Sequence, residues 1–226
     1  MKELLRRYKF HWSEERYRFS APLAIFAFFL SIAANFYATL YATEEASNPV
    51  TDIILSNVRV FDVDALFVYG TLILIVFVVL LCLSHPKRLP LMLHSLSLFY
   101  FTRAIFVTLT HLGPFPGRVV LDIGAFTAKF LGGADLFFSA HTGVPFLLAL
   151  MFWNHKKLRY IFLVWSAFFA IIVLLGHLHY SIDVLSAFFI TYTIYHIALW
   201  LFPKEYALFH AEDSENSASV VANKIA

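Results

Sequence analysis

Residues 65–84 read ALFVYGTLILIVFVVLLCLS, a run of 20 residues without a charged side chain. A helix rises about 1.5 Å per residue, so a run of about 20 apolar residues can cross the hydrocarbon core of a bilayer. The run is continuously apolar, whereas the strands of a membrane β-barrel alternate between apolar and polar residues. The stretch therefore predicts a transmembrane helix.

The chain as a whole is also strongly hydrophobic. Of its 226 residues, 60% are hydrophobic and 14% are charged, and the mean hydropathy is +0.73. Soluble domains carry about 25% charged residues, so this composition excludes a cytosolic enzyme and a disordered protein. Cys82 is the single cysteine, which excludes an intramolecular disulfide, a cysteine-rich zinc site and an iron–sulfur cluster.

Five further stretches have a similar length and composition. The six predicted spans are residues 20–42, 65–84, 91–112, 136–153, 160–176 and 184–202. We therefore expect an all-α integral membrane protein with six transmembrane helices in one membrane domain over residues 20–203. An amphipathic segment over residues 1–19 precedes this domain, and a polar, disordered tail over residues 204–226 follows it.

The positive charges predict the orientation of the spans. If the amino terminus is cytoplasmic, thirteen lysines and arginines fall on the cytoplasmic side, and only Arg59, Arg118 and Lys129 fall on the other. The positive-inside rule then places both termini in the cytoplasm. With the basic residues distributed in this way, the net charge of +2 leaves no basic stripe, and we expect no nucleic-acid partner.

Ionisable side chains are expensive inside a membrane, so each one is a candidate functional residue. The candidates are His94, Arg103, His111, Asp135, His141, His177, His179, Asp183 and His196. Under the predicted topology, six of them gather at the outer ends of spans three to six: His111, Asp135, His141, His177, His179 and Asp183. We therefore expect a site on the extracytoplasmic face, which is periplasmic, lumenal or extracellular.

The spacing of three of these residues suggests phosphoryl chemistry. His179 and Asp183 are four residues apart, so on a helix they share a face and the carboxylate can hold one imidazole nitrogen. An imidazole held in this way is a better nucleophile or base. His141 supplies a second histidine, so one could attack phosphorus while the other protonates the departing oxygen. Arg103 could bind the phosphate in a bidentate manner.

Other interpretations of these residues stay open. His177, His179 and Asp183 could bind zinc, but residues two apart on a helix point in nearly opposite directions, so we expect no metal and no cofactor. His179 and Asp183 could form an interfacial helix cap, and backbone carbonyls or Asp135 could satisfy Arg103 structurally. A transporter lined by the polar residues is a further alternative, but apart from His94, Arg103 and His196 the polar residues do not continue along one face to the cytoplasmic side.

The segments DLFFSAHTG (residues 135–143) and HLHYSIDV (residues 177–184) resemble the paired motifs of the sphingomyelin synthase family. This family is a branch of the lipid phosphate phosphatase, or type 2 phosphatidic acid phosphatase, superfamily. The resemblance extends from about Arg103 to Trp200. It implies a six-helix lipid phosphate phosphatase-like bundle with cytoplasmic ends, in agreement with the predicted spans.

The resemblance also implies a role for each site residue. His141, His179 and Asp183 would form a catalytic triad in which His179 is the nucleophile, Asp183 orients it, and His141 acts as acid and then base. Arg103 is the candidate phosphate-binding residue. The secondary candidates around the triad are Asp135, His177 and Tyr180.

Two departures from the superfamily pattern refine the expected function. Ala140 stands where the first motif usually has glycine. Ile172 and Val173 stand where the phosphatases carry a Ser-Arg pair, which favours the synthase-like branch. We expect transfer of phosphocholine or phosphoethanolamine from a glycerophospholipid donor to a ceramide or diacylglycerol acceptor. The alternative is a lipid phosphatase or phospholipase C-type hydrolase that uses the same site.

Overall fold

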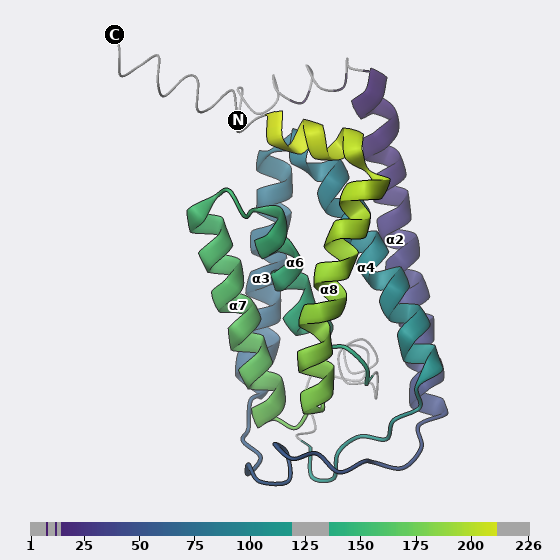
Figure 1. Ribbon diagram of the computed structural model, residues 1–226, viewed down its shortest axis with the longest axis vertical. Helices are drawn as coiled ribbons and strands as arrows, with labels where there is room; N and C mark the ends of the chain where they lie inside the picture. Colours follow the sequence, from purple (N-terminus) through teal and green to yellow (C-terminus); the bar gives the residue numbers. More distant parts are fainter. Residues whose placement is uncertain (1–7, 9–11, 13–14, 119–135, 212–226) are drawn as a thin grey trace.

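The computed structural model describes residues 8, 12, 15–118 and 136–211, whose regular structure is helical (Figure 1). The elements are α2 (Glu15–Glu44), α3 (Asp64–Ser84), the short 3-10 helix η1 (Pro86–Arg88), α4 (Leu89–Leu109), α6 (Ala140–Met151), α7 (Lys156–Leu175) and α8 (Ser181–Leu201). Five helices are long and apolar enough to cross a membrane: Tyr17–Glu44, Asp64–Ser84, Pro86–Leu109, Lys156–Leu175 and Ser181–Leu201. The prediction of an all-α integral membrane protein is therefore confirmed.

The helices pack as a bundle. Helix α2 runs along α4, while α6 packs against α7 and α8, α3 against α7, and α4 against α8. The chain connections at the lower end in Figure 1 are residues 45–63, 110–118 and 176–180, and we call this end the loop end. Helices α3 and α8 begin there, so the beginnings of helices far apart in the chain come together at one end of the bundle.

The stretch predicted as the span 136–153 contains only the 12-residue helix α6. A helix of this length is about 18 Å long, well short of a hydrocarbon core of about 30 Å. The reason lies just before the helix, where Phe137 and Phe138 have positive φ angles of 141° and 23°. Such angles are incompatible with a right-handed helix, so α6 begins at Ala140, inside the bundle (Figure 1). Six full spans are therefore not confirmed.

The two ends of the chain fall largely outside the described residues. Most of the predicted amphipathic segment 1–19 lies there, as do residues 212–226 of the predicted tail. Residues 203–211, however, are helical, which corrects the prediction of disorder from residue 204. Phe209 explains the difference, because it is fully buried and the Arg88 guanidinium lies 5.5 Å from its ring centroid.

Gly143 sets the distance between α6 and its neighbours. A Cβ atom at this position would lie 2.7 Å from a ring carbon of Phe99 on α4 and 2.8 Å from the Thr191 hydroxyl oxygen on α8. Both neighbours are fully buried and cannot move easily. We expect Gly143→Ala to lower the stability by about 1–3 kcal/mol because overpacking displaces buried side chains.

The thermal unfolding temperature in detergent measures this effect. Gly70→Ala on α3 is the matched control, since its added Cβ would lie 3.1 Å from the ring of Phe168, which is only partly buried and can yield. Equal unfolding temperatures for the two variants would contradict the tight approach of α6.

Candidate active site

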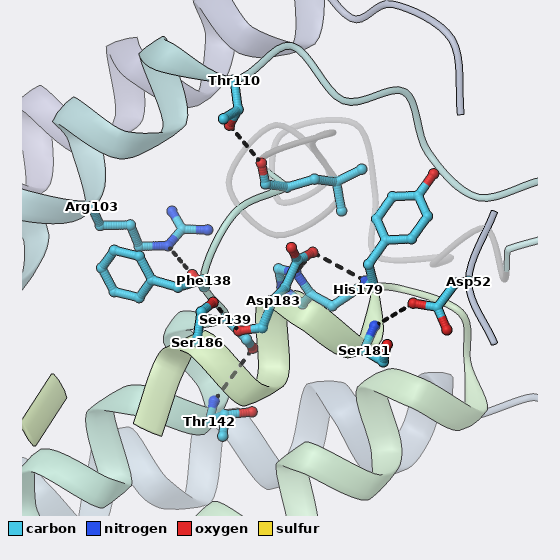
Figure 2. A network of polar contacts seen from close by, with 12 residues as sticks. Asp52, Arg103, Thr110, Phe138, Ser139, Thr142, His179, Ser181, Asp183 and Ser186 are labelled. Carbon is cyan, nitrogen blue, oxygen red and sulfur yellow. Dashed lines mark hydrogen bonds and ion pairs between the residues drawn. The ribbon is translucent and has the colours of Figure 1, made fainter. Parts of the chain in front are cut away.

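His179 and Asp183 form a buried pair at the loop end (Figure 2). The Asp183 side chain is fully buried, and its Oδ2 atom lies 3.2 Å from Nδ1 of His179. The same oxygen accepts the backbone N–H of Tyr180 at 3.0 Å. The second oxygen, Oδ1, is buried without a hydrogen-bond partner among the described residues. The carboxylate thus fixes both the histidine ring and the backbone beside it.

The pair forms in a different way from the one that the spacing predicted. Helix α8 begins at Ser181, so His179 precedes the helix and the two residues do not share a helical face. Asp183 is in the first turn, where a carboxylate can bind the free backbone N–H groups of the helix terminus. Its side chain therefore points back toward the backbone of Tyr180, within reach of the His179 ring.

His177 is held apart from this pair. Its φ angle is +52°, and its Nε2 atom lies 3.0 Å from the Val58 carbonyl oxygen. Its ring also contacts Phe115, with 5.3 Å between centroids. The sequence predicted this separation from helical periodicity, whereas it arises in a non-helical connection. Among the described residues, no group of three or more His, Cys, Asp or Glu side chains is arranged to hold a metal ion.

His141 lies in the first turn of α6, and its ring packs against two phenylalanines. The ring centroids are 4.4 Å from Phe67 on α3 and 5.5 Å from Phe169 on α7. The residue that precedes α6, Ser139, donates its backbone N–H to the Asp183 carbonyl oxygen at 3.1 Å. The beginnings of α6 and α8 are therefore adjacent, and the two sequence motifs meet in the fold.

Arg103 is buried in α4 beside the segment that leads into α6 (Figure 2). Its Nε–H group donates to the Phe138 carbonyl oxygen at 3.2 Å, and Nη1 donates to Oδ1 of Asn35 at 3.0 Å. A backbone carbonyl thus binds part of the guanidinium, as the structural interpretation of this residue expected. Asp135, its other expected partner, lies outside the described residues.

Asp52, in the connection between α2 and α3, is a site residue that sequence reasoning missed. Its Oδ2 atom accepts the backbone N–H of Ser181, the first residue of α8, at 2.7 Å. Its Oδ1 atom accepts the N–H groups of Ile54 at 2.8 Å and Leu55 at 3.1 Å. Burial raises the pKa of the Asp52 carboxyl, but the hydrogen bonds from Ser181, Leu55 and Ile54 outweigh it, so the pKa is lowered overall.

Tyr180 joins two loops to the residue after His179. Its side chain is 1% exposed; the hydroxyl donates to the Gly113 carbonyl oxygen at 2.8 Å and accepts the Val50 N–H at 3.1 Å. Burial raises the pKa of this phenol, so the hydroxyl keeps its proton at neutral pH. Tyr180 therefore has a supporting place beside the pair.

Two further histidines lie elsewhere in the bundle. On α4, Nδ1 of His94 lies 2.9 Å from the Pro90 carbonyl oxygen. On α8, the His196 ring packs against Tyr192 and Tyr195. Both contacts agree with the interpretation of these histidines as packing residues.

Comparison with known proteins gives one family match. Residues 132–200 match the family model described as PAP2 superfamily C-terminal. No curated protein and no solved structure matches the chain. The matched segment includes α6, α7 and all but the last residue of α8, together with His141, His179 and Asp183. It supports the PAP2 superfamily as a whole without singling out the sphingomyelin synthase branch. The segment that builds the buried pair is thus similar to the C-terminal part of the PAP2 superfamily, whose members are enzymes of the phosphatase or phosphotransferase type.

Proposed function

We propose that this protein transfers a phospho-headgroup, phosphocholine or phosphoethanolamine, from a glycerophospholipid to ceramide or a diacylglycerol-like acceptor. The observation that carries the proposal is the buried pair of His179 and Asp183, whose nitrogen and oxygen are 3.2 Å apart. The similarity of residues 132–200 to the PAP2 superfamily supports a phosphatase or phosphotransferase chemistry at this pair.

In the first half-reaction, His179 is the nucleophile. Its Nδ1–H donates to Asp183, which leaves the lone pair of Nε2 available to attack phosphorus. A P–N bond forms as the bond from phosphorus to the glycerol oxygen breaks. The electron pair goes to that oxygen, which takes a proton from the His141 imidazolium and leaves as diacylglycerol. The Asp183 carboxylate stabilises the positive charge of the phosphorylated imidazole.

In the second half-reaction, His141 acts as a base instead of an acid. Neutral His141 takes the proton from the ceramide hydroxyl, and the hydroxyl oxygen attacks the phosphohistidine. The P–N bond breaks, its electron pair returns to Nε2 of His179, and the headgroup leaves on the acceptor. Contacts with Phe67 and Phe169 limit the rotation of the His141 ring, which favours a fixed direction for both proton transfers.

Three kinds of support surround the reacting residues. We assign to Arg103 the binding of the phosphate oxygens, since a buried guanidinium attracts the negative charge that collects there. His177 and Tyr180 hold the connection around His179 to the neighbouring loops. We retain Asp135 as a secondary candidate from its place in the first motif.

We place the site on the extracytoplasmic face of the membrane, with both termini in the cytoplasm. The fold supports this orientation, because the described basic side chains gather at the end opposite the loop end. This end carries Arg88, Lys156, Lys157, Arg159 and Lys204, while the loop end carries Arg59 and Arg118. Such an asymmetry is typical of a cytoplasmic end.

A hydrolase is the second candidate, because water could resolve the phosphohistidine in place of the lipid acceptor. The residues before His177 bear on which hydrolase is possible. Ile172 and Val173, which stand where the phosphatases carry Ser-Arg, are 5% and 0% exposed in the core. These apolar side chains offer no hydrogen-bond donor to the dianionic phosphate of a monoester such as phosphatidate. A phosphodiester donor, whose phosphate carries a single negative charge, needs fewer donors, so a phospholipase C-type hydrolase is a stronger alternative than a phosphatidate phosphatase.

Product analysis tests the proposal. The purified protein in mixed micelles is supplied with phosphatidylcholine, phosphatidylethanolamine and fluorescent ceramide, and the lipids are separated by chromatography. We expect a new phosphosphingolipid together with diacylglycerol, and the headgroup of the product identifies the donor. Diacylglycerol with a free phospho-headgroup, whether or not ceramide is present, would instead establish the hydrolase. Absence of lipid turnover, with phosphatidate also supplied, would reject both.

A further inference from the structure

The connection between α2 and α3 is attached to the connection between α7 and α8. Near its end, Phe61 donates its backbone N–H to the Leu175 carbonyl oxygen at 2.9 Å. Val58 contacts the His177 ring, and Val50 donates to the Tyr180 hydroxyl. These bonds run along both sides of His179, so the direction in which this residue presents its ring depends on a loop far away in the sequence.

Asp52 makes the strongest of these attachments. Its side chain is 6% exposed, and both of its oxygens are used. One oxygen binds the N–H groups of Ile54 and Leu55 within its own loop, and the other binds Ser181 at 2.7 Å. Hydrogen bonds from N–H groups to a charged carboxylate are stronger than neutral ones. The carboxylate therefore joins the loop to the first residue of α8.

We propose that Asp52 is a positioning residue for the nucleophilic histidine, an inference that rests on the proposed function. Two carboxylates bind two consecutive backbone N–H groups: Asp183 binds that of Tyr180 and Asp52 binds that of Ser181. Together they fix the backbone immediately after His179. In Figure 2, Asp52 approaches this backbone from the side opposite Arg103. The two hydrogen bonds thereby restrain the backbone from which the His179 ring projects.

The consequence for catalysis follows from the alignment that transfer requires. Nε2 must approach phosphorus opposite the leaving oxygen, and a displacement of about 1 Å can lower the rate by about 100-fold. Asp52 does not touch the lipid in this scheme, so its loss should slow the reaction of bound substrate and leave substrate binding intact. A residue that only stabilised the loop would lower the unfolding temperature without changing the rate of the folded enzyme.

The contact can be removed from either side. Asp52→Ala removes the acceptor, and Ser181→Pro removes the donor. Proline is favoured at the first position of a helix, where its missing N–H is tolerated. Tyr180 has φ −70° and ψ 157°, angles that suit a residue before proline. Asp52→Asn is the second variant on the loop side, because its oxygen can still bind Ile54 and Leu55 and preserve the loop.

The control is Asp62→Ala. Asp62 belongs to the same loop and carries the same charge, and its carboxylate accepts the N–H of Asp64 at the beginning of α3. It lies next to the beginning of α3 instead of α8, so its replacement should leave kcat within about twofold of the wild type. Thermal unfolding and size-exclusion profiles establish the folded fraction of every variant.

The test compares kcat and KM for headgroup transfer among these variants. We expect Asp52→Ala, Asp52→Asn and Ser181→Pro each to lower kcat by about 10- to 100-fold, with KM within about twofold. The double variant Asp52→Ala/Ser181→Pro should be no slower than the slower single variant, because both changes remove the same contact, the hydrogen bond from Ser181 to Asp52.

Four outcomes would overturn the inference. It fails if Asp52→Asn, with a wild-type unfolding temperature, keeps full kcat. It also fails if the losses of Asp52→Ala and Ser181→Pro multiply, or if KM rises in place of the fall in kcat. If wild type and His179→Ala give the same turnover, the proposed function itself fails and the inference with it. If the wild type turns over lipid and His179→Ala does not, the proposed function stands. Any of the first three outcomes then counts against the role of Asp52 alone.

Discussion

Replacement of His179 by alanine is expected to reduce headgroup transfer by at least about 10,000-fold, as removal of the nucleophile does in other covalent mechanisms. The imidazole supplies the nitrogen that bonds to phosphorus, and alanine has no atom that can replace it. The measurement is the rate of phosphosphingolipid formation at saturating donor and ceramide. The wild type should also show a mass increase on the peptide that contains His179 during turnover, and the variant should not.

Two further variants separate chemistry from folding. His179→Gln keeps a polar side chain at this buried position and should be equally inactive. His196→Phe, near the other end of α8, preserves the aromatic contacts with Tyr192 and Tyr195 and should retain wild-type activity. Transfer by His179→Ala at more than about one tenth of the wild-type rate would reject a phosphohistidine at this position.

Asp183→Asn is expected to lower kcat by about 100- to 10,000-fold while the protein stays folded, in line with the same change in serine protease triads. The carboxylate holds Nδ1 of His179 and stabilises the positive charge of the phosphorylated ring. An amide has no charge to do so. Its NH₂ group would also occupy the place of Oδ1, which is buried and has no hydrogen-bond partner within the described part of the chain, and would disturb the geometry of the pair.

The control for this substitution is Asp64→Asn. Asp64 occupies the first turn of α3 as Asp183 occupies that of α8. The same change there should leave kcat within about twofold of the wild type. If the two substitutions have equal effects on kcat, then Asp183 acts only through the stability of its helix and does not orient the histidine.

Composition predicted most of the helices because length and apolarity suffice to recognise a span. The run predicted at 65–84 forms α3 over Asp64–Ser84. The exception is 136–153, where the sequence is apolar but the backbone of Phe137 and Phe138 is not helical. The Phe138 carbonyl binds Arg103, a contact across 35 residues. Local periodicity contains no information about such a contact.

In the candidate site, too, the sequence predicted local contacts but not long-range ones. The spacing of His179 and Asp183 predicted that they would meet, although the helical face that justified the prediction does not exist. The contact of Asp52 with Ser181 spans 129 residues and belongs to no motif. The contact of Asp52 with Ile54 could have been predicted from the sequence, since an aspartate that binds the N–H two residues later forms an Asx turn. The contact of Asp52 with Ser181 could be found only in the folded bundle.

The separation between Asp52 and Ser181 also has a consequence for the order of synthesis. At about 5–20 residues per second, a ribosome needs roughly 6–26 s to make the 129 residues that separate them. During this interval, of the three N–H groups that the Asp52 carboxylate binds in the folded structure, only those of Ile54 and Leu55 have been made. The attachment of this loop to the backbone beside His179 can therefore form only after the beginning of α8 has been made, several seconds after the loop itself.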